Sequence, residues 1–297
     1  MTKKTILSPL VYLCIALSIL SIFWGKEIRV GVLRGIEISW KNIIPTLFPF
    51  FILSDLWSVS FEIFENSIVS RTFKRIFGIP GCCLSAFLSG VLFGFPLGVK
   101  TACKLYDNGC VNKKQLSTLC GFSNNPSMAF VVSGIGVGIL GSIKKGIMLF
   151  FACVISAVIC GMLFRNSEEE PQHLEDISGQ RFDLTESIKG AGLTSLVISS
   201  FIIFFSAIIT PIGRLVDNQF VFASIASLLE VSSAVDIISK LHGKLKILLL
   251  GFALGFSGLS VHLQSFSILP RDFSKARYLL IKAVQGLICA LLSSLLI

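Results

Sequence analysis

The segment Gly94-Phe95-Pro96-Leu97-Gly98 interrupts an apolar stretch that runs from Cys82 to Val99. A proline flanked by glycines stops a helix, because proline lacks an N–H donor and glycine adopts turn conformations freely. Each limb beside the segment has about ten residues, and a helix of that length covers only about half of a bilayer core of about 30 Å. We therefore expect a re-entrant hairpin, residues 81–108, whose tip is Gly94 to Gly98.

The composition indicates a membrane protein. Of the 297 residues, 53% are hydrophobic and 14% are charged, whereas roughly a quarter of the residues in a soluble domain are charged. The formal net charge of +9 does not indicate nucleic acid binding, because Lys and Arg lie in short clusters between apolar runs. Such clusters are typical of cytoplasmic loops beside lipid head groups. The lipid bilayer is therefore an expected partner, and nucleic acid is not.

The residue types that carry enzyme and metal chemistry lack the necessary spacing. The nine cysteines form no C-x-x-C pair, and His173, His242 and His262 are far apart in the sequence, with no ligand pair at helical spacing. There is no P-loop of the G-x-x-x-x-G-K-[ST] kind and no nucleophile beside a base at helical spacing. We expect no enzyme activity, no metal site and no cofactor.

A second hairpin and two broken helices follow from the same reasoning. The second hairpin, residues 220–240, has Glu230 to Ser233 at its tip. Two longer apolar stretches are interrupted as well, at Phe122-Ser123-Asn124-Asn125-Pro126 in residues 115–142 and at Phe256-Ser257-Gly258-Leu259-Ser260 in residues 245–269. Unwound backbone at membrane depth occurs where it is buried in protein or lines a watered cavity.

Each half of the chain then has the same order of elements: a helix, a hairpin, a broken helix and a second helix. Such duplicated units with opposite orientation are typical of secondary transporters. The sequence predicts an all-α membrane protein of two inverted repeats, each with a re-entrant helical hairpin and a broken transmembrane helix. The expected divisions are an anchor helix (6–24) and an interfacial helix (27–41) within residues 1–41, a first repeat (42–164), a polar connector (165–189) and a second repeat (190–297).

The four interruptions predict a substrate site where they meet. Half-helix N-termini favour a bound carboxylate or phosphate, and Lys100 would neutralise an anionic solute unless it reaches the head groups or pairs with Glu230. Glu230 would carry a proton, help hold a cation or form a structural ion pair. Ser257 and Ser260 are better explained as caps, and His262 as a buried histidine or a proton carrier. The residues assigned to substrate binding lie at or beside the interruptions: Gly94, Phe95, Gly98, Lys100, Ser123, Asn124, Asn125, Glu230, Ser232, Ser233, Ser257, Ser260, His262 and Gln264.

Four motifs carry a resemblance to a known family: Leu47-Phe48-Pro49-Phe50-Phe51, Gly94 to Lys100, Phe122 to Asn125, and Gly258 to Gln264. In them the chain resembles the YlbJ-type sporulation integral membrane proteins, members of the nucleoside-recognition "gate" group. Phe95 stands where the family's Gly-Tyr-Pro-x-Gly tip has tyrosine. The resemblance implies a fold similar to that of concentrative nucleoside transporters. It also implies a multi-pass protein of the cell membrane, in endospore formers the outer forespore membrane, that helps to move dipicolinate into the spore.

The leading hypothesis is therefore a secondary transporter of a small anionic aromatic solute, most simply dipicolinate, a planar dianion that would suit Lys100, the half-helix N-termini, Phe95 and Phe122. One alternative is a nucleoside or nucleobase transporter, in which Asn124, Asn125 and Gln264 read the ring edges. Another is a non-transporting sporulation membrane scaffold, which predicts continuous helices. A homo-oligomer is compatible with each of them.

Overall fold

The computed structural model describes residues 22–58, 67–165, 183–270 and 273–297. The predicted anchor helix (6–24) lies almost wholly outside these residues, as do residues 166–182 of the predicted polar connector (165–189). The last part of that connector is instead helical, because α9 begins at Leu184. Within them the chain is helical and has no strand. The elements, in chain order, are α2 (Gly25–Ile38), η1 (Ser39–Ile43), α3 (Ile44–Ser58), α4 (Ile68–Phe77), η3 (Gly81–Cys83), α5 (Leu84–Phe93), α6 (Leu97–Asp107), α7 (Lys113–Ser123), η4 (Phe130–Val137), α8 (Ile143–Leu163), α9 (Leu184–Leu215), α10 (Gln219–Leu229), α11 (Val231–Ser239), α12 (Gly243–Phe256), α13 (Gly258–Ile268) and α14 (Lys275–Leu296).

Five described helices are long and apolar enough to cross a membrane, and a sixth span is counted if one bent pair forms a single crossing. The five are Gly25–Leu56, Ile143–Leu163, Leu184–Leu215, Gly243–Ile268 and Lys275–Leu296. The bent pair joins Ile68–Phe77 to Gly81–Phe93 at an angle of 97°. The prediction of an all-helical chain with apolar helices of spanning length is confirmed. The inverted relationship of the two halves stays a prediction.

The first long helix differs from the prediction. Residues 27–41 were expected to form a separate interfacial helix, but α2, η1 and α3 are continuous and give one candidate span of 32 residues. The reason is packing against α9: Gly31 lies against Ser206 and Ala207, and Gly35 lies against Ile203. Small residues four positions apart allow two helices to approach closely. The small residues of this segment therefore form a helix–helix contact with α9.

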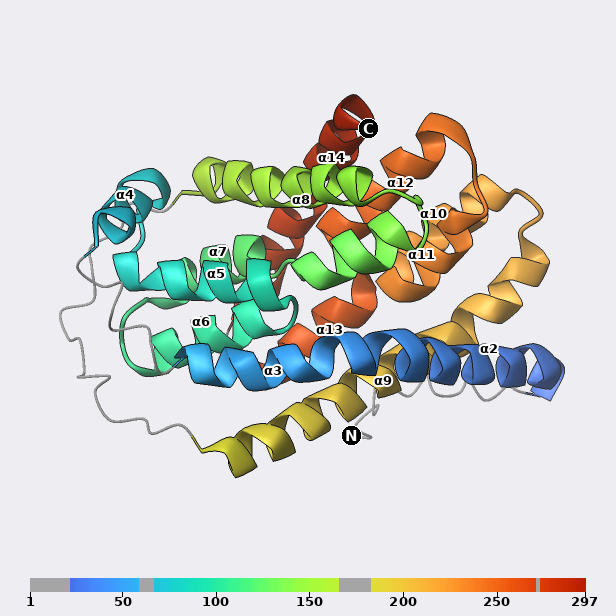
Figure 1. Ribbon diagram of the computed structural model, residues 1–297, viewed down its shortest axis with the longest axis horizontal. Coiled ribbons are helices and arrows are strands. Elements are labelled where there is room, and N and C mark those ends of the chain that lie inside the picture. Colours follow the sequence, from blue (N-terminus) through green and yellow to red (C-terminus); the bar gives the residue numbers. More distant parts are fainter. Residues whose placement is uncertain (1–21, 59–66, 166–182, 271–272) are drawn as a thin grey trace, which may run out of the picture.

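The two hairpins lie at opposite ends of the molecule, with α5 and α6 on one side and α10 and α11 on the other (Figure 1). The long helix α2–η1–α3 and α9 run side by side along one face. The two helices that close the halves, α8 and α14, also contact each other, and α14 packs against α7 and α12. The broken helices thus lie between these two pairs.

The first hairpin is held by a cluster of phenylalanine rings. Phe77 on α4 stacks on Phe122 of α7 with ring centroids 5.1 Å apart, and Phe73 and Phe87 pack around them. Phe122 is fully buried in this cluster. It anchors the end of α7 and does not face a solute site, which corrects the sequence-based expectation for its ring.

Candidate substrate site

The helical backbone stops at all four interruptions named from the sequence. In the first half, α5 ends at Phe93 before Gly94, which has a φ of 87°, and α7 ends at Ser123 before non-helical residues 124–127. In the second half, Glu230 separates α10 from α11 in an extended conformation. Ser257 separates α12 from α13 with a left-handed φ of 75°.

In each half, the tip of the hairpin packs against the break of the same half. A Cβ added at Gly94 would lie 2.8 Å from the backbone nitrogen of Ser127, just after the first break. A Cβ added at Gly258 would lie 3.2 Å from the nitrogen and the Cα of Glu230. Gly98 faces the carbonyl oxygen of Ser123 in the same close way. The glycines therefore let two irregular backbone segments touch without side chains between them.

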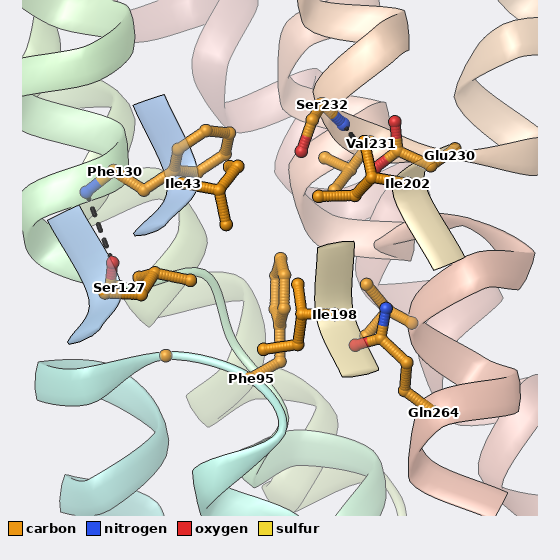
Figure 2. Close-up of a pocket in the computed structure, with 13 residues that line it drawn as sticks. Ile43, Phe95, Ser127, Phe130, Ile198, Ile202, Glu230, Val231, Ser232 and Gln264 are labelled. Atoms are coloured by element: carbon orange, nitrogen blue, oxygen red, sulfur yellow. Dashed lines mark hydrogen bonds between the residues drawn. The ribbon is translucent and has the colours of Figure 1, made fainter. Parts of the chain in front are cut away.

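Three of the four irregular segments line one pocket, which we call the central pocket, and α13, the helix that follows the second break, adds Val261 and Gln264 to it (Figure 2). Figure 2 shows Phe95 rising from the first tip toward Phe130, with Glu230 and Gln264 on the opposite wall. The cavity volume is about 20 Å³, which is enough for a water molecule but not for an aromatic ring. The lining residues are Ile43, Leu47, Gly94, Phe95, Ser127, Phe130, Ile198, Ile202, Glu230, Val231, Ser232, Val261 and Gln264.

A second cavity, which we call the vestibule, lies between η1, η4 and α11 and has a volume of about 760 Å³. It shares Ile43, Phe130 and Ser232 with the central pocket. Its polar lining residues include Lys41, Asn42, Thr46, Ser133, Asp236 and Ser239. A wide polar entrance thus leads to a narrow pocket, with shared residues at the boundary.

Five of the predicted site residues line the central pocket: Gly94, Phe95, Glu230, Ser232 and Gln264. Glu230 is 1% exposed, and its two carboxylate oxygens accept hydrogen bonds from the backbone nitrogens of Ser232, at 2.8 Å, and Ser233, at 2.6 Å. It therefore caps α11. Gln264 donates to Ser260 Oγ at 3.3 Å, and its buried Oε1 has no hydrogen-bond partner among the described residues.

Lys100 does not line the central pocket and does not pair with Glu230. Its Nζ lies 3.5 Å from Asp55 Oδ1 on α3, and its side chain is 42% exposed. Glu230 forms no ion pair within the described part of the chain. The reason is topology, because α6 runs from the tip back along α3 and carries Lys100 away from the second hairpin.

Asn124 and Asn125 are buried behind the pocket and take part in a polar network with α14. Asn124 Nδ2 donates to Tyr278 Oη at 2.7 Å and to Ser265 Oγ at 3.0 Å. Gln285 Nε2 donates to Asn125 Oδ1 at 2.7 Å. Lys282 Nζ donates to the carbonyl oxygen of Asn124 at 2.8 Å. The two asparagines therefore join the break to α14, whereas the sequence favoured direct contact with a ligand.

The other predicted residues also lie outside the lining. His262 is buried, and its Nδ1 lies 3.2 Å from Tyr278 Oη. Ser257 Oγ donates to the carbonyl oxygen of Leu254, as expected for a cap. The remaining predicted residues that are not part of the lining are Gly98, Ser123, Ser233 and Ser260, of which the three serines are buried beside the breaks.

The sequence analysis missed Tyr278, Lys282 and Gln285, which are fully buried. They follow one another at four- and three-residue intervals in an otherwise apolar helix, which places them on one face. That polar stripe is the signal that could have identified them.

The central pocket is mostly apolar, with a few polar groups, and it is not basic. Glu230 is its one charged lining residue, and no Lys or Arg of the described chain lines it. The same described residues contain no group of three His, Cys, Asp or Glu side chains that could hold a metal ion. The site can therefore offer a carboxylate, an amide, two hydroxyls and aromatic rings to a guest.

Comparison with known proteins adds the family. No family model matches the chain, and no solved structure matches it. The chain is 24% identical to the sporulation integral membrane protein YlbJ of Bacillus subtilis (strain 168) over 309 aligned positions, which cover 88% of this chain and 76% of the relative. This similarity, together with the apolar helices, supports the resemblance to the YlbJ-type sporulation integral membrane proteins that was drawn from the four motifs.

Proposed function

We propose that the protein is a secondary transporter that moves a small polar solute through the central pocket. The observation that carries this proposal is that both hairpin tips, the first break and the helix that follows the second break line one pocket, which adjoins a wide vestibule. Unwound backbone is tolerated in a membrane where it is buried in protein or lines a cavity. A scaffold has no use for four such segments at one place.

Two ion pairs support an alternating-access cycle. Arg34 on the long helix pairs with Asp236 on α11, and Asp55 on the same helix pairs with Lys100 on α6. The second limbs of the two hairpins, α6 and α11, are thus both tied to the long helix, α11 through Arg34 and α6 through Asp55. In the proposed cycle, each hairpin moves away from that helix in turn, and the narrow pocket widens to admit the solute from one side at a time.

For the solute we propose dipicolinate, in the outer forespore membrane, because this is what the family resemblance implies. The central pocket offers Phe95 and Phe130 for a flat ring. The cation nearest to the first break is Lys282, behind Asn124.

A neutral nucleoside or nucleobase is the second candidate solute. It is favoured by the unpartnered Oε1 of Gln264 and by the lack of Lys and Arg in the described lining. A ring N–H group can donate to this amide oxygen, whereas a dianion beside Glu230 meets a like charge.

Uptake by proteoliposomes tests the proposal. Labelled dipicolinate and labelled uridine are offered separately, and empty liposomes give the background. We expect saturable uptake of one of the two solutes. Phe95→Asp should abolish this uptake, and the control variant Leu295→Asn, at a residue that lines neither the pocket nor the vestibule, should keep it. If correctly folded protein, eluting as a single species, moves neither solute, the transporter proposal fails and the scaffold becomes the better explanation.

A further inference from the structure

Lys282 has a buried side-chain amine for which the described residues provide no counter-ion. It lies about two turns into α14 and is 0% exposed. Its Nζ donates to the carbonyl oxygen of Asn124 at 2.8 Å and to Gln285 Oε1 at 2.8 Å. Within the described part of the chain, no carboxylate pairs with it. An ionisable residue in a membrane-spanning helix is costly and is generally kept for a function.

The ammonium group of Lys282 lies in the kind of place where transporters with broken helices bind a coupling cation. Asn124 follows directly on the last residue of α7, so its carbonyl lies at the negative end of that half-helix. In transporters with broken helices, such free carbonyls and half-helix C-termini coordinate the coupling cation. Here the side chain of Lys282 already supplies a positive charge to them.

We propose that Lys282 is the proton-binding site that couples transport to a proton gradient. The inference rests on the proposed transport function and names its coupling ion. A proton from water on one side binds the lone pair of the Lys282 amine, and the resulting ammonium holds the break against α14. On the other side the N–H bond breaks, the proton returns to water, and the neutral amine holds the Asn124 carbonyl less strongly.

The polar network connects this site to the pocket. Gln285 bonds both to Lys282 and to Asn125, and Ser127, two residues farther on, lines the central pocket. On the other side, Asn124 bonds to Ser265, which adjoins the pocket-lining Gln264 on α13. A change of charge at Lys282 therefore acts on two walls of the pocket.

Other titratable groups come from the helices around Lys282. Those near it are His262 on α13, Cys153 and Cys160 on α8, and Tyr278 and Cys289 on α14 itself, and α7 adds Cys120 beside Tyr278. The α12 helix meets α14 through Gly251 and Gly255. None of these groups is a carboxylate, and only His262 and Lys282 gain positive charge when they bind a proton. His262→Gln is therefore the variant that separates these two.

The test uses proteoliposomes of the full chain in sodium-free buffer, with the membrane potential held at zero by potassium and valinomycin. Labelled dipicolinate is the first probe and uridine the second. For one proton per solute, a pH gradient of one unit supports about tenfold accumulation in the wild type.

Lys282→Met and Lys282→Arg, with fixed neutral and fixed positive side chains, should keep exchange of labelled for unlabelled solute but lose accumulation. His262→Gln and Lys246→Met should keep both. The latter removes a lysine that also donates to a backbone carbonyl, that of Ser239 at 2.9 Å, but outside the network.

The variant Lys282→His tests whether another side chain that binds a proton can replace the lysine. An imidazole takes up its proton at lower pH than an amine, so this variant should regain accumulation with a pH profile displaced to the acidic side. A purely structural lysine predicts no such displacement. The inference is overturned if the wild type needs sodium, if a pH gradient does not drive accumulation, or if Lys282→Met accumulates solute as the wild type does. If the Lys282 variants do not fold, the two wild-type measurements still decide. A wild type without any exchange overturns the transport function itself, which is a separate result.

Discussion

The backbone of Glu230 lies directly against Gly258, so that a Cβ at Gly258 would be 3.2 Å from the nitrogen and the Cα of Glu230. The tip of the second hairpin thus meets the second break without an intervening side chain. Gly94 and Ser127 have the same relationship in the first half. These two contacts set the distance between the walls of the central pocket, because residues on both sides of each contact line it.

Gly258→Ala tests the second contact. The residue has a φ of 75°, a conformation that costs an L-residue roughly 1–2 kcal/mol, and the added methyl group would also push Glu230 away. Gly243→Ala is the matched control, because Gly243 has a φ of 70° and nothing lies within 4 Å of its added Cβ. We expect thermal unfolding in detergent to show a greater loss of stability for Gly258→Ala, by about 1 kcal/mol or more. Equal losses for the two variants would show that the tip and the break are not in close contact.

A second prediction concerns the cap at Glu230. Glu230→Ala leaves the backbone N–H groups of Ser232 and Ser233 without partners in a buried place, at a cost of about 1–3 kcal/mol each. Glu230→Asn keeps an acceptor at the N-terminus of α11 and should recover part of that stability. Chemical denaturation of the purified variants measures both.

The control for this cap is Asn218, which caps α10 and is exposed. Its single Oδ1 accepts hydrogen bonds from the backbone nitrogens of both Phe220 and Val221. Water can replace its side chain, so Asn218→Ala should cost only about 0.5–2 kcal/mol. If Glu230→Asn is no more stable than Glu230→Ala, the carboxylate matters for its charge and not for capping.

The positions of the interruptions could be predicted because their signals are local. Gly94 and Pro96 cannot continue a helix, and Ser257 with Gly258 marks a break within a few residues. The same reasoning found the pocket-lining Phe95 and Glu230. It needed only the length of each limb and the cost of unwound backbone in lipid.

The partners of charged and polar residues could not be predicted, because they come from distant parts of the chain. Lys100 pairs with Asp55, and Arg34 pairs with Asp236, which depends on how the hairpins lie against the long helix. The sequence predicts that the side-chain amide of Asn124 contacts a ligand, because the sequence does not show that α14 passes behind the break. An aromatic residue such as Phe122 can likewise lie in a core or at a binding site. Here the packing of α4 against it places it in the core.

The link between the first break and α14 gives a third prediction. Asn125 Oδ1 accepts a hydrogen bond from Gln285 Nε2 at 2.7 Å, in a fully buried place. A double-mutant cycle with Asn125→Ala and Gln285→Ala should give a coupling free energy of about 0.5–3 kcal/mol, as for residues in one buried network. The unfolding free energies of the four proteins provide the measurement. As a control, the changes in unfolding free energy of Asn125→Ala and Gln219→Ala, a residue on the exposed first turn of α10, should be additive. If these two changes are not additive either, the coupling between Asn125 and Gln285 is not evidence of their hydrogen bond.

The ion pairs between the long helix and the hairpins give the last prediction. The side chains of Arg34 and Asp236 are 31% and 46% exposed, and those of Lys100 and Asp55 are 42% and 26% exposed. Pairs this exposed contribute little to stability, about 0–1 kcal/mol. Arg34→Gln and Lys100→Gln should therefore leave the melting temperature nearly unchanged but change the rate of solute exchange, because each releases one hairpin. Reversing a pair, as in Arg34→Asp with Asp236→Arg, should return the rate toward that of the wild type.

The control for these variants is the pair of Glu37 and Lys41, which lies on the same long helix, with Lys41 Nζ 2.7 Å from Glu37 Oε1. This pair joins two successive turns and no hairpin, so Glu37→Gln should change neither stability nor exchange rate. A reversed Arg34–Asp236 pair that stays as impaired as the single variants would mean that Asp236, which lines the vestibule, acts on the solute and not through its pair with Arg34. A Glu37→Gln variant with an altered rate would mean that the charge of the helix as a whole, and not the tie to the hairpins, controls transport.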